Sequence, residues 1–324
     1  MPDPMFQYHV DEAAAGQRLD KFLSLQLPHL SRTKVKESID AGGASVNGAV
    51  ARPSLTLKRG DRIFFRAELK KAGVESMPEN LPLTILYEDA SLAVVEKPAG
   101  MVVHVGAGVR SGTLVNALRY HLRSLSQSPD DTRPGIVHRL DKLTSGLMVV
   151  ARNDAAHAAL SEQFRTRRVE KKYIALVHGR LPRRSGEIIL PIARDRVHRT
   201  RMTTRRREGR EALTRYRVIR EFEKYSLLDV EIKTGRTHQI RAHLSAIGHP
   251  VVGDRTYGAP EKIWWPGQPK PLPTLERHFL HAAHLGFEHP VDRRRMIFDS
   301  PLPPPLADFL AACEKSSAPV SSVC

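Results

Sequence analysis

A short segment near the middle of the chain, Gly135 to Arg152, places a cluster of ionisable residues between two apolar runs. The runs, 136–137 and 147–150, are rich in branched residues and free of breakers, which predicts two short buried strands. The polar residues between them are His138, Arg139, Asp141, Thr144, Ser145 and Gly146. A loop held by buried strands is a common position for a catalytic group. A structural ion pair followed by a plain turn would give the same local pattern, so both interpretations stay open at this level.

The charge balance is the most informative feature of the composition. The chain has 324 residues, with 41% hydrophobic and 27% charged residues, as in ordinary globular proteins, and is long enough for two or three domains. Its 51 Lys and Arg against 35 Asp and Glu give a net charge of +16. Such an excess favours a polyanionic partner, either nucleic acid or an anionic membrane surface.

Several classes of protein are disfavoured. No apolar run approaches the roughly 18 residues of a membrane-spanning helix, so we expect no membrane association through a span. The start of the chain, 1–4, lacks the basic and apolar features of a secretion signal. The two cysteines, Cys313 and Cys324, cannot form a structural zinc site by themselves. We therefore expect a cytoplasmic protein without a metal or cofactor.

Residues 16–66 predict a small separate module. Apolar residues recur at helical spacing from Leu19 to Leu27, Ser31 is a candidate N-cap for a second helix to Ile39, and Asn47-Gly48 indicates a hairpin turn. This αα-then-β unit carries ten Lys or Arg against four Asp or Glu. A basic face suits RNA phosphates, although a merely solvated face is the alternative. The candidate RNA-binding residues are Arg18, Lys21, Arg32 and Lys34.

A second basic segment spans 194–220, where eleven arginines face only three acidic residues. Arginine suits forked contacts with phosphate, and so many like charges repel unless an anion neutralises them. The glycine at 209 and the polar flanks favour a protruding hairpin over a helix. A solvated loop is the alternative. We expect RNA contact here, with Arg199 and Arg201 as candidates, together with Arg236 farther along the chain.

The remaining chain predicts a linker at 67–80, a catalytic domain at 81–312 and a flexible tail at 313–324. Patterns within the domain predict paired strands near 85–87 and 92–95, further strands at 171–177 and 227–232, and helices at 113–122 and 155–164. After the last of these strands, Gly235 permits a tight turn, and a helix should open at Thr237.

Two motifs carry a family resemblance. The string His-Arg-Leu-Asp-Lys-Leu-Thr-Ser-Gly, 138–146, closely resembles the signature of the RluA-type pseudouridine synthases, and Thr-Gly-Arg-Thr-His-Gln-Ile-Arg, 234–241, resembles their second motif. Residues 17–23, Ser31-Arg32 and 46–48 resemble the RNA-binding module named after the fourth ribosomal protein of the small subunit. The resemblance implies an α+β fold, with a mostly antiparallel mixed sheet, flanking helices and a central active-site cleft.

The same resemblance implies roles for individual residues. Asp141 would be the catalytic carboxylate, Arg241 its ion-pair partner and Tyr173 the aromatic that packs against the target base. Ile240 would pack in the pocket, Arg139 would reach into the RNA as the base swings out, and His138 would fix the geometry of the loop. Asp141 could attack the sugar, attack the base or take a proton from the ribose. A nearby guanidinium would oppose the rise in pKa that burial imposes on a carboxyl group. Arg241 is the candidate, because it is permanently charged and can hold a carboxylate by two hydrogen bonds.

Three other classes fit the residues less well. A metal-dependent nuclease that used zinc would place two histidines four residues apart on a helix, whereas His238 and His243 are five apart. One that used magnesium would need an acidic cluster, and none accompanies Asp141 in the sequence. A non-catalytic ribosome-assembly factor explains the charge but not the loop around Asp141. A serine hydrolase would need a Gly-x-Ser-x-Gly elbow, which is missing. The N-terminal module and the sequence around Asp141 resemble the branch of the family that acts on the large ribosomal subunit, and this resemblance implies 23S ribosomal RNA as the substrate, with transfer RNA as the alternative. We expect the enzyme to be a monomer.

Overall fold

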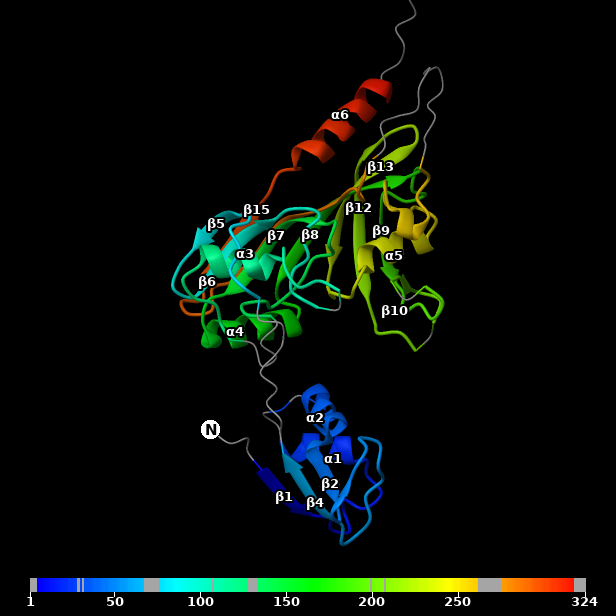
Figure 1. Cartoon of the computed structure of the whole chain (residues 1–324). Helices are drawn as coiled ribbons and strands as arrows, with labels where there is room; N and C mark the ends of the chain where they lie inside the picture. The colour runs from blue at the N-terminus through cyan, green and yellow to red at the C-terminus, as the bar shows by residue number, and fades with distance from the viewer. Residues whose placement is uncertain are drawn as a thin grey trace, which may run out of the picture. The chain divides into compact units, whose positions relative to one another are not determined.

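The structure is a computed structural model, and its described residues form two compact units, one up to residue 66 and one from residue 76 onward (Figure 1). The described ranges are 5–27, 30, 32–66, 76–106, 108–127, 133–198, 200–206, 208–261 and 275–317, with the side chains of 33, 34 and 315–317 left aside.

The first unit packs two helices on a small antiparallel sheet. The helices are α1 (Leu19–Gln26) and α2 (Arg32–Ser38), followed by the tight turn η1 (Ile39–Gly43). The sheet has the order β1-β4-β2-β3, from β1 (Met5–His9), β4 (Arg62–Arg66), β2 (Ala44–Val46) and β3 (Ala49–Val50). The expected αα-then-β order is present, but β1 was not expected and pairs along its whole length with β4.

The turn at Asn47-Gly48 has the backbone conformation that its sequence predicts. Asn47 has φ 54° and Gly48 has φ 84°, the two positive values that a two-residue hairpin turn of type I′ requires. The Asn47 side chain also accepts a hydrogen bond from the Arg62 backbone N–H at 2.9 Å. The turn therefore fixes the β2–β3 hairpin and ties it to β4.

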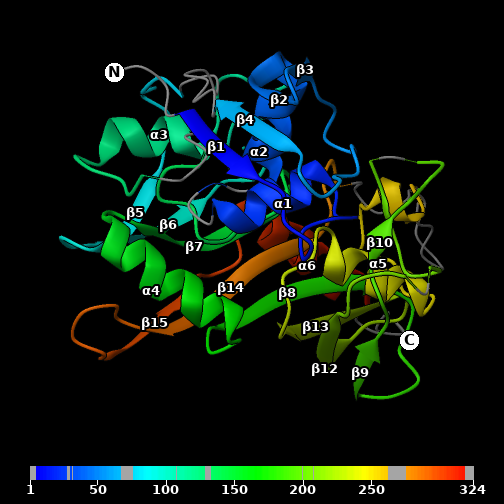
Figure 2. The ribbon, with the colours of Figure 1, turned by 90° about the horizontal axis from the view of Figure 1, so that it is seen from below.

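The second unit is built on a nine-stranded sheet of order β5-β6-β7-β14-β8-β13-β12-β9, with β15 paired to β14 (Figure 2). Every pair of strands is antiparallel except β7 and β14, so the predicted mostly antiparallel mixed sheet is confirmed. The strands are β5 (Thr84–Glu88), β6 (Leu92–Lys97), β7 (Ser145–Ala151), β8 (Glu170–His178), β9 (Ser185–Ile189), β12 (Leu213–Glu221), β13 (Tyr225–Ile232), β14 (Leu280–Glu288) and β15 (Arg295–Asp299).

Helices cover both faces of this sheet. They are α3 (Leu114–His121), α4 (Asp154–Arg165), α5 (Gln239–Ala246), α6 (Pro304–Ser317) and the short 3-10 helix η2 (Arg255–Tyr257). Met148 and Val150 of β7 belong to one core cluster with α3, while Leu147 and Val149 belong to another with α4. Burial on both faces explains why β7 is continuously apolar rather than alternating.

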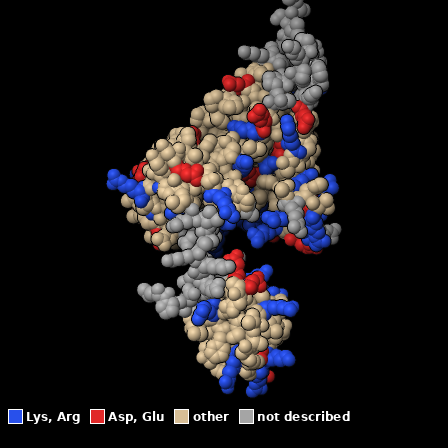
Figure 3. All heavy atoms as spheres, viewed as in Figure 1, with Lys and Arg blue, Asp and Glu red and all other residues tan. Residues whose placement is uncertain are grey.

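The arginine-rich segment forms a small two-stranded arm. It contains β10 (Ala193–Arg194) and β11 (Met202–Thr203), which pair with each other apart from the main sheet. Part of the expected hairpin therefore exists, but the arginines from 215 onward lie on β12 within the main sheet. Lys and Arg side chains gather around β10 in the space-filling view (Figure 3).

Two segments differ from the expected boundaries. Residues 76–80, expected within a linker, pack on the second unit: Ser76 is buried, and the Glu79 backbone N–H donates to the Asn116 carbonyl at 3.0 Å. Helix α6 continues five residues into the expected tail because Cys313 is buried in the main core. Residues 67–75 and 318–324 lie outside the described residues.

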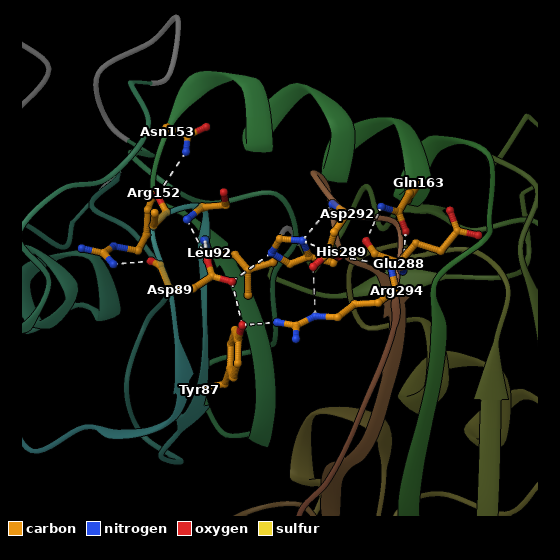
Figure 4. A network of polar contacts seen from close by, with 12 residues as sticks. Tyr87, Asp89, Leu92, Arg152, Asn153, Gln163, Glu288, His289, Asp292 and Arg294 are labelled. Carbon is orange, nitrogen blue, oxygen red and sulfur yellow. Dashed lines mark hydrogen bonds and ion pairs between the residues drawn. The ribbon is translucent and has the colours of Figure 1, made fainter.

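A polar network joins the strand ends at one end of the sheet (Figure 4). Asp89, between β5 and β6, accepts hydrogen bonds from the Tyr87 hydroxyl (2.7 Å), from the backbone N–H groups of Ser91 and Leu92, and pairs with His289 after β14 (2.9 Å). Burial alone would raise the pKa of Asp89, but the hydrogen bonds outweigh it and lower the pKa to about 2. The ionised carboxylate therefore holds two distant hairpin ends together.

Replacing Asp89 should destabilise the second unit without altering its pocket. Asp89→Ala removes the acceptor of the Tyr87 hydroxyl and of two backbone N–H groups as well as the partner of His289 Nε2, and we expect the free energy of unfolding to fall by about 2–3 kcal/mol. Because the pKa of Asp89 is depressed in the folded state, its contribution is present above pH ~4 and is lost as the pH falls toward 2. Urea unfolding across this pH range measures both effects, with the exposed Asp308→Ala as the control. Equal loss in both variants would contradict the assignment.

Candidate active site

The loop 138–144 is held by Lys97 and by residues around the start of β14 before the chain enters β7. The Lys97 ammonium, at the end of β6, donates to the carbonyl oxygens of Pro98 (2.7 Å), Met101 (2.9 Å) and Lys142 (3.2 Å). Burial lowers the pKa of Lys97 to about 7, although the charge of Asp141 opposes this shift. The lysine thus ties the Asp141 loop to the neighbouring loop 98–101.

The segment leading into β14 supplies the other anchors of the loop. Thr144 Oγ1 shares a 2.8 Å hydrogen bond with His278 Nε2, and Ser145 Oγ shares one of 2.9 Å with His281 Nδ1. The Arg277 guanidinium donates to the Leu143 carbonyl at 3.0 Å. Burial lowers the pKa of His278 to about 2, so this imidazole stays neutral. These contacts give Thr144 and Ser145 a structural purpose beyond an ordinary turn.

Gly146 is required by close approach of two strands. Its φ is +119°, and a Cβ at this position would lie 2.3 Å from the Ala282 carbonyl oxygen. This is the point where β7 and β14 pair in parallel. A side chain here would push the strands apart, so the glycine allows the Asp141 loop to sit against β14.

Helix α5 delivers the second half of the site. His238 precedes it in a left-handed conformation with φ 54°. The Gln239 side chain accepts from the Arg236 backbone N–H (3.1 Å) and donates to the Leu213 carbonyl (3.0 Å). This anchor fixes the first turn of α5, which directs Ile240 into the pocket and Arg241 toward Asp141.

Arg241 is shared by two carboxylates. It donates from Nη1 to Asp141 Oδ2 at 3.1 Å, and from Nε and Nη2 to the two oxygens of Asp254 at 2.6 and 2.8 Å. The forked contact therefore goes to Asp254, whereas Asp141, for which we expected it, receives one hydrogen bond. Burial would lower the pKa of Arg241, but the two carboxylates raise it, and the guanidinium stays charged.

Asp141 opens into a cavity of about 520 Å³, a size suited to a small ligand. Six of the predicted residues line it: His138, Arg139, Asp141, Tyr173, Ile240 and Arg241; Arg236, expected to bind RNA, lines it as well. Burial raises the pKa of Tyr173, as does the charge of Asp141, so its hydroxyl stays protonated. Tyr173 and Ile240 are buried, Arg139 is exposed, and the Asp141 side chain is 16% exposed. The cavity thus combines an apolar floor, one accessible carboxylate and basic groups.

His138 supports the loop through its ring. Its Nε2 accepts the Val149 backbone N–H at 3.0 Å, and the ring stacks on Phe164 at 4.6 Å between centroids. Burial, aided by the charge of Lys171, lowers the pKa of His138 to about 3. A neutral imidazole in these contacts suits the predicted positioning role.

Several residues around Asp141 received no role from the sequence. Asp254 clamps Arg241, and the Tyr257 ring lies 5.0 Å from the Arg241 guanidinium carbon and 5.1 Å from that of Arg201 on the arm. The Tyr257 hydroxyl accepts the Met202 N–H at 2.9 Å and lies 3.1 Å from His238 Nδ1. His238 Nε2 in turn lies 3.9 Å from Asp141. The sequence around Asp254 and Tyr257 has no local pattern that indicates these contacts, because pairing between distant segments is not visible along the chain.

The residues expected to contact RNA lie in different surroundings. In the first unit, Arg18 and Arg32 both pair with Asp20 at 3.0 Å, keep side-chain exposures of 50% and 61%, and have the exposed Lys21 nearby in sequence. In the second unit, Arg201 packs on Tyr257, and the Arg236 side chain donates to the Glu211 carbonyl. Arg199 and the side chain of Lys34 lie outside the described residues.

The described residues also bear on whether the site could hold a metal ion and whether a helix could cross a membrane. Among the described residues, no group of three or more His, Cys, Asp or Glu side chains could hold a metal ion. In the same part of the chain, every helix is too short or too polar to cross a lipid bilayer.

Known proteins resemble both units. The profile of the RNA pseudouridylate synthase family matches residues 91–246, and that of the S4 domain matches 17–63. An uncharacterized RNA pseudouridine synthase of Aquifex aeolicus is 48% identical, covering 87% of this chain and 89% of the relative. The ribosomal large subunit pseudouridine synthase D of Zymomonas mobilis is 42% identical over 93% of this chain and 95% of the relative.

A solved structure agrees with these sequence relatives. The human RNA pseudouridylate synthase domain containing 1 superposes with a TM-score of 0.54 at 28% identity, covering 74% of this chain and 90% of that chain. The family profile spans the loop of Asp141 and the first turn of α5, the two segments that meet in the pocket. The chain therefore belongs to the RNA pseudouridine synthase family and carries an S4 domain ahead of its synthase domain.

Proposed function

We propose that this chain converts specific uridines of large-subunit (23S) ribosomal RNA to pseudouridine, with Asp141 as the catalytic carboxylate. The observation that carries the assignment of the residue is the contact of Asp141 with Arg241, a permanently charged and buried partner from a segment about a hundred residues away. The relatives named as ribosomal large subunit enzymes support the substrate. We further propose that the chain works as a monomer on cytoplasmic RNA.

The reaction is an isomerisation and needs no cofactor to balance. The bond from ribose C1′ to uracil N1 breaks, the base turns, and a bond from C1′ to C5 forms, while C5 loses a proton and N1 gains one. Asp141 serves this sequence as an ionised group, either as nucleophile or as proton acceptor. Arg241 contacts the Asp141 carboxylate directly, and Asp254 holds the guanidinium so that it cannot turn away.

The remaining pocket residues suit the handling of an extruded base. A uridine must leave its stack before its C1′ can reach Asp141, and stacking on an aromatic ring offsets part of that cost. Tyr173 offers such a ring, with Ile240 lining the same cavity. Arg139, exposed at the cavity and two residues before Asp141, is suited to enter the space that the base vacates. The part of His138 is to hold the Asp141 loop in position through its contacts with Val149 and Phe164.

Asp141→Asn should abolish conversion while retaining the fold and RNA binding. An amide can neither attack nor accept a proton as a carboxylate does, and loss of a catalytic carboxylate lowers the rate by about a thousandfold or more. The measurement is tritium release from C5-labelled uridine in a ribosomal RNA transcript, with Asp308→Asn as the control. Retained turnover would remove Asp141 from its role.

Deleting residues 1–66 should weaken RNA affinity more than it slows saturated turnover. The first unit has its own core, separate from that of the synthase domain, and its exposed arginines suit phosphate contacts. Kd for ribosomal RNA and kcat of the shortened chain test the two effects separately. An unchanged Kd would contradict an RNA-binding role for this unit.

The target is tested by mapping pseudouridines in cells that lack the chain. We expect specific sites in 23S ribosomal RNA to revert to uridine, and to regain pseudouridine when the wild-type chain, but not Asp141→Asn, is restored. Sites lost only from transfer RNA would contradict the ribosomal substrate, and an unchanged map would contradict the proposed activity in the cell.

A further inference from the structure

Lys171, a buried cation, also lines the active-site pocket with Tyr173. Lys171 precedes Tyr173 by two residues on β8, so the alternation of the strand places both side chains on one face. Lys171 is 8% exposed and Tyr173 is 7% exposed, and both line the cavity that holds Asp141. The intervening Lys172 is exposed on the opposite face. Lys171 therefore belongs to the pocket rather than to the general basic surface.

The buried ammonium of Lys171 has no acidic partner among the residues that the structure describes. Within the described part of the chain, no Asp or Glu forms an ion pair with its ammonium, which lies 5.3 Å from the centre of the Phe164 ring. Burial, together with the neighbouring charge of Lys233, lowers the pKa of Lys171 to about 8. Buried charges are ordinarily paired, and contact with an aromatic ring compensates only part of the desolvation.

The other buried cation of the pocket is already neutralised. Arg241 contacts the two carboxylates of Asp141 and Asp254, whereas Lys171 has neither. We therefore expect the anion that neutralises the Lys171 ammonium to come from the bound ligand. In RNA the uracil and the ribose are neutral, and the phosphodiester is the anion.

We propose that Lys171 binds a backbone phosphate next to the target uridine inside the pocket, an inference that rests on the proposed RNA substrate. Residues two apart on a strand are about 6.6 Å apart, so a nucleotide whose base packs on Tyr173 brings an adjoining phosphate toward Lys171. An ammonium suits this task because it is a compact point charge that accepts a phosphate from several directions. Lys171 thereby holds the extruded nucleotide by its backbone while Tyr173 holds the base.

A thermodynamic cycle tests the contact. The full chain and its Lys171→Met variant, both in the Asp141→Asn background that prevents turnover, are titrated with a ribosomal RNA fragment containing the target uridine. Two further fragments carry a neutral methylphosphonate at the linkage before or after that uridine. We expect Lys171→Met to raise Kd by about 10- to 100-fold on the unmodified RNA, the range of a charge-assisted hydrogen bond. With one of the neutral linkages, wild type and variant should bind equally.

Controls separate this contact from general charge and from pocket shape. Lys172→Met removes the same charge one residue away and should change Kd less than about threefold, as expected of an exposed position outside the pocket. Lys171→Arg keeps the charge and should restore most of the affinity. The slope of log Kd against log salt should fall by about 1 in Lys171→Met. Melting temperatures verify that each variant is folded.

The outcomes are decisive in both directions. A variant that binds as wild type does, or that loses affinity equally on charged and neutral linkages, overturns the phosphate contact. If wild type forms no pseudouridine but the cycle still shows coupling, the proposed reaction fails while the phosphate site stands. If conversion occurs without coupling, Lys171 fails and the proposed function remains.

Discussion

The arrangement of the active site depends on one guanidinium held between two carboxylates. Arg241 has a side chain that is 6% exposed, and that of Asp254 is 1% exposed. Burying either charge alone would carry a large desolvation penalty. The forked contact between Arg241 and Asp254 compensates part of that penalty and fixes the orientation of both side chains. Asp141 then meets a cation whose orientation is already fixed, while its own side chain remains partly open to the cavity. Because Asp254 takes the forked contact, Asp141 keeps a single hydrogen bond to Arg241 and stays accessible from the cavity.

The interior of the second unit explains how the two motifs come together. The loop of Asp141 depends on Lys97 behind it and on Thr144 and Ser145, whose partners lie near the start of β14. The first turn of α5 depends on the Gln239 side chain, which reaches β12 and the loop before the helix. Tyr257 connects this region to the arm through Arg201 and the Met202 backbone. An RNA contact that displaced the arm would therefore also displace Tyr257, which lies against Arg241.

Local pattern was sufficient for much of the fold. The apolar run at 147–150, the helical spacing before Leu27 and the Asn47-Gly48 turn each act through short-range physics, and each formed as expected. The contact of Asp141 with Arg241, implied by the family resemblance, is also present. Long-range pairing was not visible: β1 joins β4 across most of the first unit, and Asp254 takes the fork of Arg241 that was expected for Asp141. That no described Asp or Glu pairs with Lys171 is visible only in the folded chain, because the sequence shows neighbours along the chain and not across it.

The close contact at Gly146 limits how this catalytic loop could be reused in protein engineering. The loop and β7 alone would not carry its geometry, because Arg277, His278 and the backbone of Ala282 complete its support from the far end of the domain. A graft into another scaffold would have to transfer β14 in parallel register with β7. The smallest portable version of the loop is therefore a pair of discontinuous segments, and because β7 and β14 are parallel, any linker that joins them must be a crossover connection rather than a short turn.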